Sequence, residues 1–293
     1  MINPKTLVPG FFYEVMYTKK IALGTVQFGM DYGISKKAGQ TPFEEVKKLL
    51  NYAEKNHIKT IDTAFGYGDS EVVLGKLLNE RFEVITKFLP ESLAGTIQSQ
   101  LETSLNHLKV DQVYGYLAHR PKDLLENINI WEKLKEFKDQ NKVQKIGFSL
   151  NEPEEYFSLK ANGCIPDLVQ LPYNYLDNRF NNVIKELKDN NCEVHTRSVF
   201  LQGLFFMNPE GLSGYFSEVV PVLKKLQHQF KSKLPGALLK YVLSNELIDK
   251  VVIGVQNLQQ LQDNLKQLET ATLPKPFDGH LPDSILQPSQ WVV

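Results

Sequence analysis

The sequence predicts a single α/β domain of the (β/α)8 TIM barrel class, and three observations carry this prediction. Short β-branched or aromatic segments alternate with helical patterns along almost the whole chain, which is typical of βα units and a parallel sheet. Eight such segments occur, and no low-complexity linker divides them into two groups. The length of 293 residues also suits one barrel, because α/β barrels routinely occupy about 200–250 residues as one domain.

The predicted strands are short and evenly distributed. They cover residues 21–25, 60–64, 82–87, 112–119, 145–149, 168–173, 193–199 and 250–255. A doubly wound open sheet is the other common α/β architecture, and it normally carries a G-x-G-x-x-G fingerprint after its first strand. The segment 24–29, GTVQFG, does not match that fingerprint. Eight βα units without a dinucleotide-binding fingerprint favour a closed barrel over an open sheet.

Apolar stripes at helical spacing lie between the predicted strands. The first helix is expected to begin at Thr41-Pro42-Phe43-Glu44, with Thr41 as N-cap, Pro42 in the first turn and Glu44 as the capping-box partner. Further stripes lie at 97–108, 128–134, 183–187, 219–226 and 258–268. Stripes of this kind face a core, so we assign them no chemistry.

The predicted domain limits follow from these elements. We expect the barrel over residues 21–270, with residues 1–20 as an N-terminal extension or hairpin at the barrel bottom. The longest connection covers 200–218. Residues 271–293 form a C-terminal tail that we place near the barrel mouth, and its four prolines exclude one regular helix.

Composition excludes several classes of protein. The 33 Lys and Arg residues against 34 Asp and Glu leave a net charge of −1, which disfavours a nucleic-acid partner. Cys164 and Cys192 give neither a disulfide framework nor a C-x-x-C motif, and no apolar run reaches the ~18 residues of a membrane span. The first 20 residues lack the pattern of a secretory signal. We therefore expect a cytoplasmic protein with no membrane partner.

Titratable side chains follow three consecutive predicted strands. Asp62 ends the second strand, Tyr67 follows five residues later, Lys87 ends the third strand and His119 ends the fourth. In a barrel these strand ends share one face, and neighbouring strands lie ~4.8 Å apart, so the four side chains fall within about 10 Å of one another. Each alone is more simply a helix cap, a packing residue or a satisfied structural residue, but the set predicts a shared site.

On these residues the sequence resembles the aldo-keto reductase superfamily, from about Ile21 to Leu268. The segments TIDTAFGYG, VITKF and YLAHRP carry Asp62, Tyr67, Lys87 and His119 in the order of that family's catalytic set. LGTVQFGMDYG and RSVFLQGL resemble a bacterial branch often associated with surface-polysaccharide gene clusters. The resemblance implies NAD(P)H-dependent reduction of an aldehyde or ketone to the alcohol, with a sugar-derived carbonyl as one candidate substrate.

The chemistry of such a reduction fits the residue types. Tyr67 would donate the proton to the carbonyl oxygen, and a neighbouring Lys87 ammonium would make the phenol a better donor. Asp62 would compensate the buried ammonium, while His119 would hydrogen-bond the substrate oxygen or relay the proton. The cofactor would carry the hydride.

The resemblance also implies a set of cofactor contacts. Ser149 and Gln170 match positions that orient the nicotinamide carboxamide, although Leu150 stands where an Asn is usual. Arg197 stands where many members stack a Tyr on the nicotinamide ring, and its plane could stack instead. Ser198, Phe200, Gln202 and Gly203 are expected at the pyrophosphate. Gly24, Thr25, Gly254, Gln256, Gln260, Asp263 and Asn264 complete the predicted cofactor-binding set.

The same resemblance favours NADP(H) over NAD(H). Gly254 and Gln260, however, occupy positions where NADPH-preferring members often carry Lys and Arg, so we expect modest discrimination between the two cofactors. Lys233, Lys240 or Arg197 could restore contacts to a 2′-phosphate.

Two other functions are compatible with a barrel. A cofactor-binding regulatory subunit of the same fold, without physiological turnover, would tolerate loss of Tyr67 or Lys87, and neither is lost. A barrel metallohydrolase needs clustered His and carboxylate ligands, whereas the six His residues are scattered and form no H-x-H pair. We therefore predict an enzyme with a small carbonyl substrate and no metal.

Overall fold

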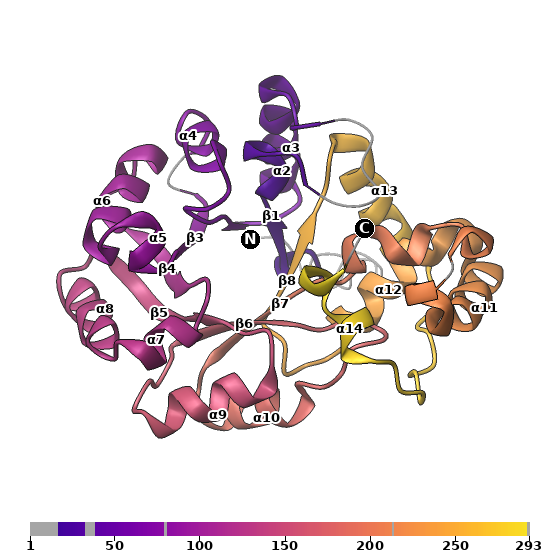
Figure 1. Ribbon diagram of the computed structural model, residues 1–293. Coiled ribbons are helices and arrows are strands. Elements are labelled where there is room, and N and C mark those ends of the chain that lie inside the picture. The colour runs from indigo at the N-terminus through magenta and orange to yellow at the C-terminus, as the bar shows by residue number, and fades with distance from the viewer. Residues whose placement is uncertain (1–16, 33–38, 79–80, 213, 292–293) are drawn as a thin grey trace, which may run out of the picture.

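The computed structural model describes residues 17–32, 39–78, 81–212 and 214–291, and these form a closed parallel barrel (Figure 1). Each strand pairs with its neighbour in sequence, and β1 closes the barrel against β8. The strands are β1 (Ile21–Gly24), β2 (Thr60–Asp62), β3 (Glu83–Phe88), β4 (Val113–Ala118), β5 (Val143–Ser149), β6 (Leu168–Pro172), β7 (Glu193–Arg197) and β8 (Lys250–Gly254). The predicted fold class is confirmed.

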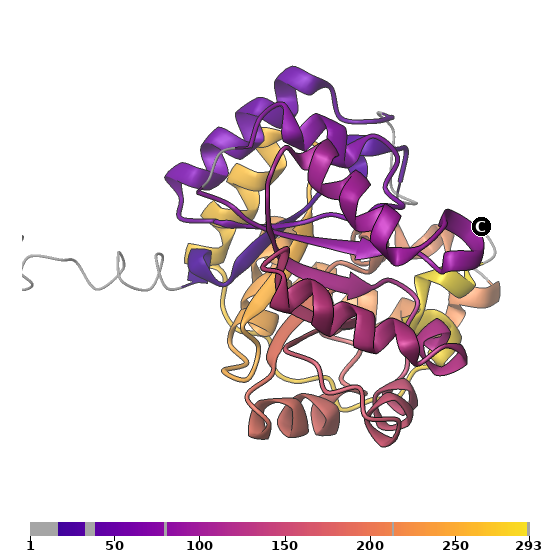
Figure 2. The same ribbon diagram turned by 90° about the vertical axis from the view of Figure 1, so that its left-hand side faces the viewer.

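Helices surround the strands, as the side view shows (Figure 2). The α-helices are α2 (Val26–Gly29), α3 (Phe43–Lys55), α4 (Ser70–Gly75), α5 (Glu91–Ala94), α6 (Ile97–Leu108), α7 (Lys122–Glu126), α8 (Asn129–Asp139), α9 (Pro153–Ala161), α10 (Asn181–Asp189), α11 (Val220–Phe230), α12 (Leu234–Leu243), α13 (Leu258–Thr270) and α14 (Asp283–Leu286). The predicted stripes bury their apolar faces; in α8, for example, Trp131, Leu134 and Phe137 are buried. Within the described residues, no helix combines the length and apolar character that crossing a bilayer requires.

The start of α3 differs from the sequence prediction. Pro42, rather than Thr41, is the N-cap, and its carbonyl accepts hydrogen bonds from the N–H groups of Glu45 and Val46. The Thr41 hydroxyl donates instead to the Gln256 carbonyl, at 3.3 Å, on the connection after β8. The capping-box prediction was therefore wrong. The Thr41 hydroxyl bonds the backbone of a residue distant in sequence and does not cap α3. Glu44 is exposed.

The expected N-terminal hairpin lies almost entirely outside the described residues. From Tyr17 onward the chain turns into β1, with the Lys20 N–H donating to the Tyr17 carbonyl. The Lys20 ammonium donates to the carbonyls of Leu243, the last residue of α12, and Asn245, which ties the start of the barrel to the connection between α12 and β8.

The long connection after β7 and the C-terminal tail share a second apolar cluster. The connection forms three short 3-10 helices, η1 (Leu201–Phe206), η2 (Pro209–Gly211) and η3 (Gly214–Val219). The tail adds α14 and η5 (Pro288–Gln290), and its Trp291 ring packs edge-on against Phe216 at 5.1 Å. The strands in Figure 2 run toward the side on which this tail lies. The tail is therefore a packed part of the carboxyl-end face.

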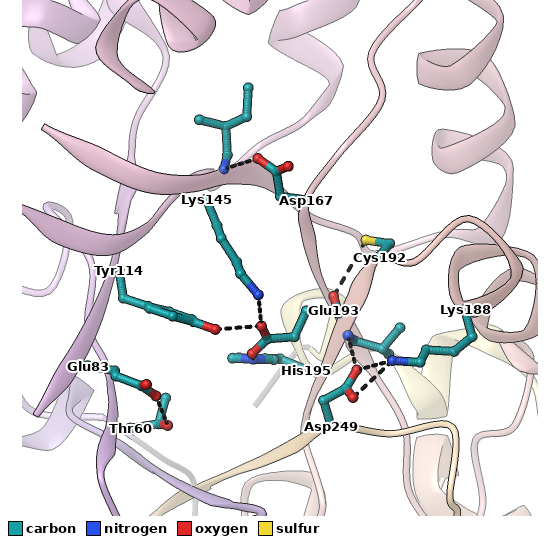
Figure 3. Close-up of polar contacts among 12 residues, drawn as sticks. Thr60, Glu83, Tyr114, Lys145, Asp167, Lys188, Cys192, Glu193, His195 and Asp249 are labelled. Atoms are coloured by element: carbon teal, nitrogen blue, oxygen red, sulfur yellow. Dashed lines mark hydrogen bonds and ion pairs between the residues drawn. The ribbon is translucent and has the colours of Figure 1, made fainter. Parts of the chain in front are cut away.

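A charged cluster occupies the opposite end of the barrel, where the strands begin (Figure 3). The Glu193 carboxylate contacts the Lys145 ammonium, the Tyr114 hydroxyl at 2.7 Å and the His195 Nε2 at 2.6 Å. Burial alone would raise the pKa of Glu193, but the hydrogen bond and charge of His195, together with the bonds from Lys145 and Tyr114, hold it well below its ordinary value. Burial and the bond to Glu193 raise the pKa of Tyr114 to about 12. This end of the barrel interior is therefore held by charge-assisted hydrogen bonds.

Candidate active site

A cavity of about 980 Å³ opens at the carboxyl ends of the strands. This volume is at the upper end of the ~300–1,000 Å³ range of ligand pockets. The predicted site residues that line it are Gly24, Thr25, Asp62, Tyr67, His119, Ser149, Gln170, Arg197, Ser198, Phe200, Gln202, Gly203, Gly254, Gln256, Gln260, Asp263 and Asn264. Lys87 does not line the cavity and lies behind Asp62. The structure thus brings every predicted site residue to one place.

A buried ion pair lies at the carboxyl ends of β2 and β3. Lys87 is fully buried, and its ammonium lies 2.7 Å from the Asp62 Oδ1 and 2.9 Å from the Thr63 carbonyl. The other Asp62 oxygen, Oδ2, accepts from the Gln170 amide at 2.7 Å. Parallel pairing of β2 with β3 places these strand ends side by side. Both charges are buried, and each oxygen of Asp62 accepts a hydrogen bond, so the pair is compensated within the fold.

Tyr67 projects from the turn after β2 over this ion pair. The Lys87 ammonium lies 5.3 Å from the centre of the Tyr67 ring, and the His119 ring meets Tyr67 edge-on at 5.6 Å. The turn is pressed against α2 at Gly29, where a Cβ atom would stand 1.8 Å from the Tyr67 carbonyl oxygen. A glycine is therefore required at this position for Tyr67 to be placed as it is.

His119 is uncharged at neutral pH. Burial, and then the nearby charges of Lys87, Arg197 and Arg120, lower its pKa to about 3. Its Nδ1 is buried without a hydrogen-bond partner among the described residues. A neutral imidazole has one N–H donor and one acceptor, so it can orient a polar ligand atom without adding charge.

Arg197 ends β7 and lines the same end of the cavity. Its Nη2 donates to the Leu150 carbonyl at 2.8 Å and to the Asn151 Oδ1 at 2.7 Å. Burial lowers the pKa of Arg197 from its ordinary value, but a guanidinium remains charged in proteins. With His119 neutral and Lys87 paired with Asp62, Arg197 leaves this end of the cavity with a positive charge.

The loop after β7 has an unusual backbone. Ser198, Leu201 and Gln202 all have positive φ, at 66°, 42° and 49°, and Gly203 follows at 97°. Non-glycine residues adopt this region at a conformational cost of about 1–3 kcal/mol each, and such strain clusters at ligand-binding loops. The loop runs along the cavity wall, where its backbone groups can meet a phosphate.

Sequence reasoning missed several residues that line the cavity. Asn151 lines the cavity, whereas Leu150, at the position where the family usually has an Asn, is buried. The side-chain amide expected at position 150 is therefore found one residue later, and its oxygen accepts a hydrogen bond from Arg197. Tyr32 follows α2, and its hydroxyl accepts from the Gln202 amide at 2.9 Å. Leu286 and Gln287 add a wall from the tail. In the sequence, only the prolines of the tail indicated that it lies near the cavity. They did not indicate which of its side chains form the wall.

The residues present fit a nicotinamide dinucleotide. The cavity lining runs from Asp62, Tyr67 and His119 to residues of α13, and the buried His119 Nδ1 has no hydrogen-bond partner among the described residues. Ser149 and Gln170 can bind a carboxamide, and the β7 loop and α13 can meet phosphates and a nucleoside, in the region where barrels commonly hold phosphate. Among the described residues, no three His, Cys, Asp or Glu side chains gather closely enough to hold a metal ion.

Comparison with known proteins decides the family. The sequence profile described as the aldo/keto reductase family matches residues 20–277, which contain the whole barrel from β1 to α13 and the start of the tail. The chain belongs to the aldo/keto reductase family.

Two bacterial proteins are similar to this aldo/keto reductase in sequence. The aldo-keto reductase YhdN of Bacillus subtilis is 28% identical over 204 residues, which span 63% of this chain and 59% of YhdN. The 6-dehydroglucose reductase of Novosphingobium aromaticivorans is 28% identical over 130 residues, which span 38% of this chain and 43% of that protein. The alignments thus cover less than two thirds of either relative.

A solved structure shows the same fold at lower identity. The aldo-keto reductase AKR11C1 from Bacillus halodurans, in its holo form, aligns with a TM-score of 0.68 and 19% identity. The alignment covers 87% of this chain and 88% of that one.

The wall that the tail contributes to this aldo/keto reductase is held by polar contacts. The Gln287 amide donates to the Glu152 carboxylate, and Arg179 bonds both Glu152 and Asp283. We predict that Gln287→Glu, which sets a second carboxylate against Glu152, loosens this wall and raises KM for the substrate about three- to ten-fold. Dinucleotide affinity should remain within two-fold of wild type by fluorescence titration, about the error of such a measurement.

Gln229→Glu is the matched control, because Gln229 is exposed on α11 and the substitution adds the same charge. Equal KM values for Gln287→Glu and Gln229→Glu would mean that the tail does not form part of the substrate site.

Proposed function

We propose that this protein reduces an aldehyde or ketone to the alcohol with a reduced nicotinamide dinucleotide, and that Tyr67 donates the proton. The observation that carries the proposal is the position of Tyr67 over the Lys87–Asp62 pair and against His119, within one cavity large enough for cofactor and substrate. Family membership supports the same chemistry.

The reduction adds a hydride to the carbonyl carbon, supplied by the bound dinucleotide, and a proton to the carbonyl oxygen. Tyr67 transfers its phenolic proton to that oxygen as negative charge develops there. The Lys87 ammonium stabilises the phenolate that remains, and Asp62 holds the ammonium in place. The neutral His119 hydrogen-bonds the carbonyl oxygen and fixes its distance from Tyr67.

The cavity lining favours a polar substrate. The exposed Tyr32 and Arg120 are part of that lining, and both can hydrogen-bond hydroxyl groups. One relative carries the name of a reductase of a dehydroglucose. We therefore place sugar-derived aldehydes and ketones first among the substrate candidates.

A carbonyl-substrate screen, following loss of reduced-nicotinamide absorbance, tests the proposal. The panel should contain simple aldehydes, simple ketones and oxidised sugars, each with NADH and with NADPH. We expect turnover with at least one carbonyl class. Dinucleotide binding without turnover across the panel would favour a cofactor-binding regulatory role instead.

A further inference from the structure

The adenosine end of the cavity carries negative charge in place of the cations that a 2′-phosphate needs. This end is formed by the connection after β8 and the first turns of α13, with Gly254, Gln256, Gln260 and Asp263 lining the cavity. A phosphate held here would rely on the N–H groups at the start of α13 and on Arg or Lys side chains.

Two of the three N–H groups in the first turn of α13, those of Leu258 and Gln260, are already bonded to side-chain acceptors. The Leu258 N–H donates to the Glu45 Oε1 at 2.8 Å, and the Gln260 N–H donates to the Asn257 Oδ1 at 2.9 Å. The Gln256 N–H donates to the Gln260 Oε1 at 2.8 Å, so the Gln260 side chain is also engaged. A phosphate would have to displace these partners.

Glu45 is the partner that matters most, because it is anionic. It lies in the first turn of α3, which packs against α13 (Figure 1). The hydrogen bond from Leu258, more than the opposing effect of burial, lowers the pKa of Glu45, so its carboxylate is ionised at neutral pH. A carboxylate on a helix N-terminus offsets the positive end of the helix dipole, which would otherwise attract phosphate.

No Lys lines the cavity among the described residues, and the two Arg residues that do, Arg120 and Arg197, lie near His119. Lys48 is exposed outside the cavity, and its ammonium pairs with the second Glu45 oxygen, Oε2, at 3.3 Å. Lys240 donates to the Ala271 carbonyl at 2.7 Å, and Lys233 is exposed on η4 (Lys231–Lys233) and does not line the cavity. The acidic Asp263 does line it.

We propose that Glu45, seated on the N-terminus of α13, selects against a 2′-phosphate, so that this chain binds NADH at least as tightly as NADPH. The inference rests on the proposed use of a nicotinamide dinucleotide, and it reverses the preference that the family resemblance implies. Glu45 does not line the cavity and acts by occupying the N-terminus of α13, whereas Asp263 lines the cavity directly. Together the two carboxylates should weaken NADPH binding on the order of ten-fold relative to NADH.

The test is a titration of intrinsic fluorescence with NADH and NADPH, for the wild type and three variants, with no substrate present. Glu45→Gln keeps an acceptor for the Leu258 N–H and removes the charge. It should tighten NADPH binding about three- to ten-fold and leave NADH binding unchanged. Glu44→Gln is the matched control, because Glu44 is exposed in the same turn and carries the same charge. It should change neither affinity. Gln260→Arg should tighten NADPH binding about ten-fold by adding a charged donor.

The outcomes separate this inference from the proposed function. Tighter binding of NADPH than of NADH by the wild type would overturn the inference and leave the reductase function standing. Equal effects of Glu45→Gln and Glu44→Gln would also overturn it, since a general charge effect would then explain the gain. Absence of binding by both dinucleotides to the folded wild type would overturn the proposed function and the inference together.

Discussion

Tyr67→Phe should lower kcat by about 10²–10⁴-fold, because it removes the proton donor and nothing else. The phenyl ring retains the packing that Tyr67 makes against His119 and above Lys87, so the fold and dinucleotide affinity should remain those of the wild type. Steady-state kinetics on the best carbonyl substrate, together with fluorescence titration of the dinucleotide, would measure both quantities.

Tyr156→Phe is the matched control, because it removes a tyrosine hydroxyl that lies outside the cavity. Tyr156 lies on α9, and its hydroxyl donates to Glu186 at the outer surface. This variant should keep the wild-type kcat. Turnover at the wild-type rate by purified Tyr67→Phe would exclude Tyr67 from proton transfer and leave His119 as the candidate.

Lys87→Met should abolish measurable turnover and also destabilise the barrel, by about 3–5 kcal/mol. The destabilisation follows from burial: Asp62 is 3% exposed, and without Lys87 its charge has no cation in contact. Urea denaturation would give the change in the free energy of unfolding, and the substrate assay would give the activity.

The double variant Asp62→Asn, Lys87→Met separates the two effects. It removes both charges, so most of the lost stability should return, because no unpaired charge remains buried. Activity should not return, since the phenolate would still lack its stabilising ammonium. A double variant that regained activity along with stability would mean that the ion pair serves only the fold.

Much of the site could be predicted from the sequence because barrel geometry converts order along the chain into proximity. Asp62, Lys87 and His119 follow consecutive strands, and the parallel register brings those strand ends together. The resemblance then supplied residues at β5 to β8, and all of them line the cavity. The hydrogen bond between Asp62 on β2 and Gln170 on β6 could not be predicted from the order of the strands. These strands lie four positions apart, and only closure of the barrel brings the two side chains together.

Other features depended on contacts between distant segments. Glu45 meets Leu258 only because α3 and α13 are neighbours across the closure of the barrel. The same closure diverts Thr41 from its predicted capping role. α12 was missed for a different reason: Leu234, Ala237, Leu238, Leu239 and Val242 are buried around most of its circumference, so no single apolar stripe marks it.

The charged cluster at the strand starts makes unfolding a proton-linked reaction in acid. Glu193 has a lower pKa in the fold than its ordinary value of 4.5, so unfolding takes up a proton there as the pH falls below that value. Its stabilising contribution is complete above about pH 4.5 and is lost progressively as the pH approaches its folded pKa. The wild-type melting temperature should therefore decline below pH 4.5, while Glu193→Gln, less stable at pH 7, should show a flatter profile. Parallel profiles for the two proteins would place the acid sensitivity on other carboxylates.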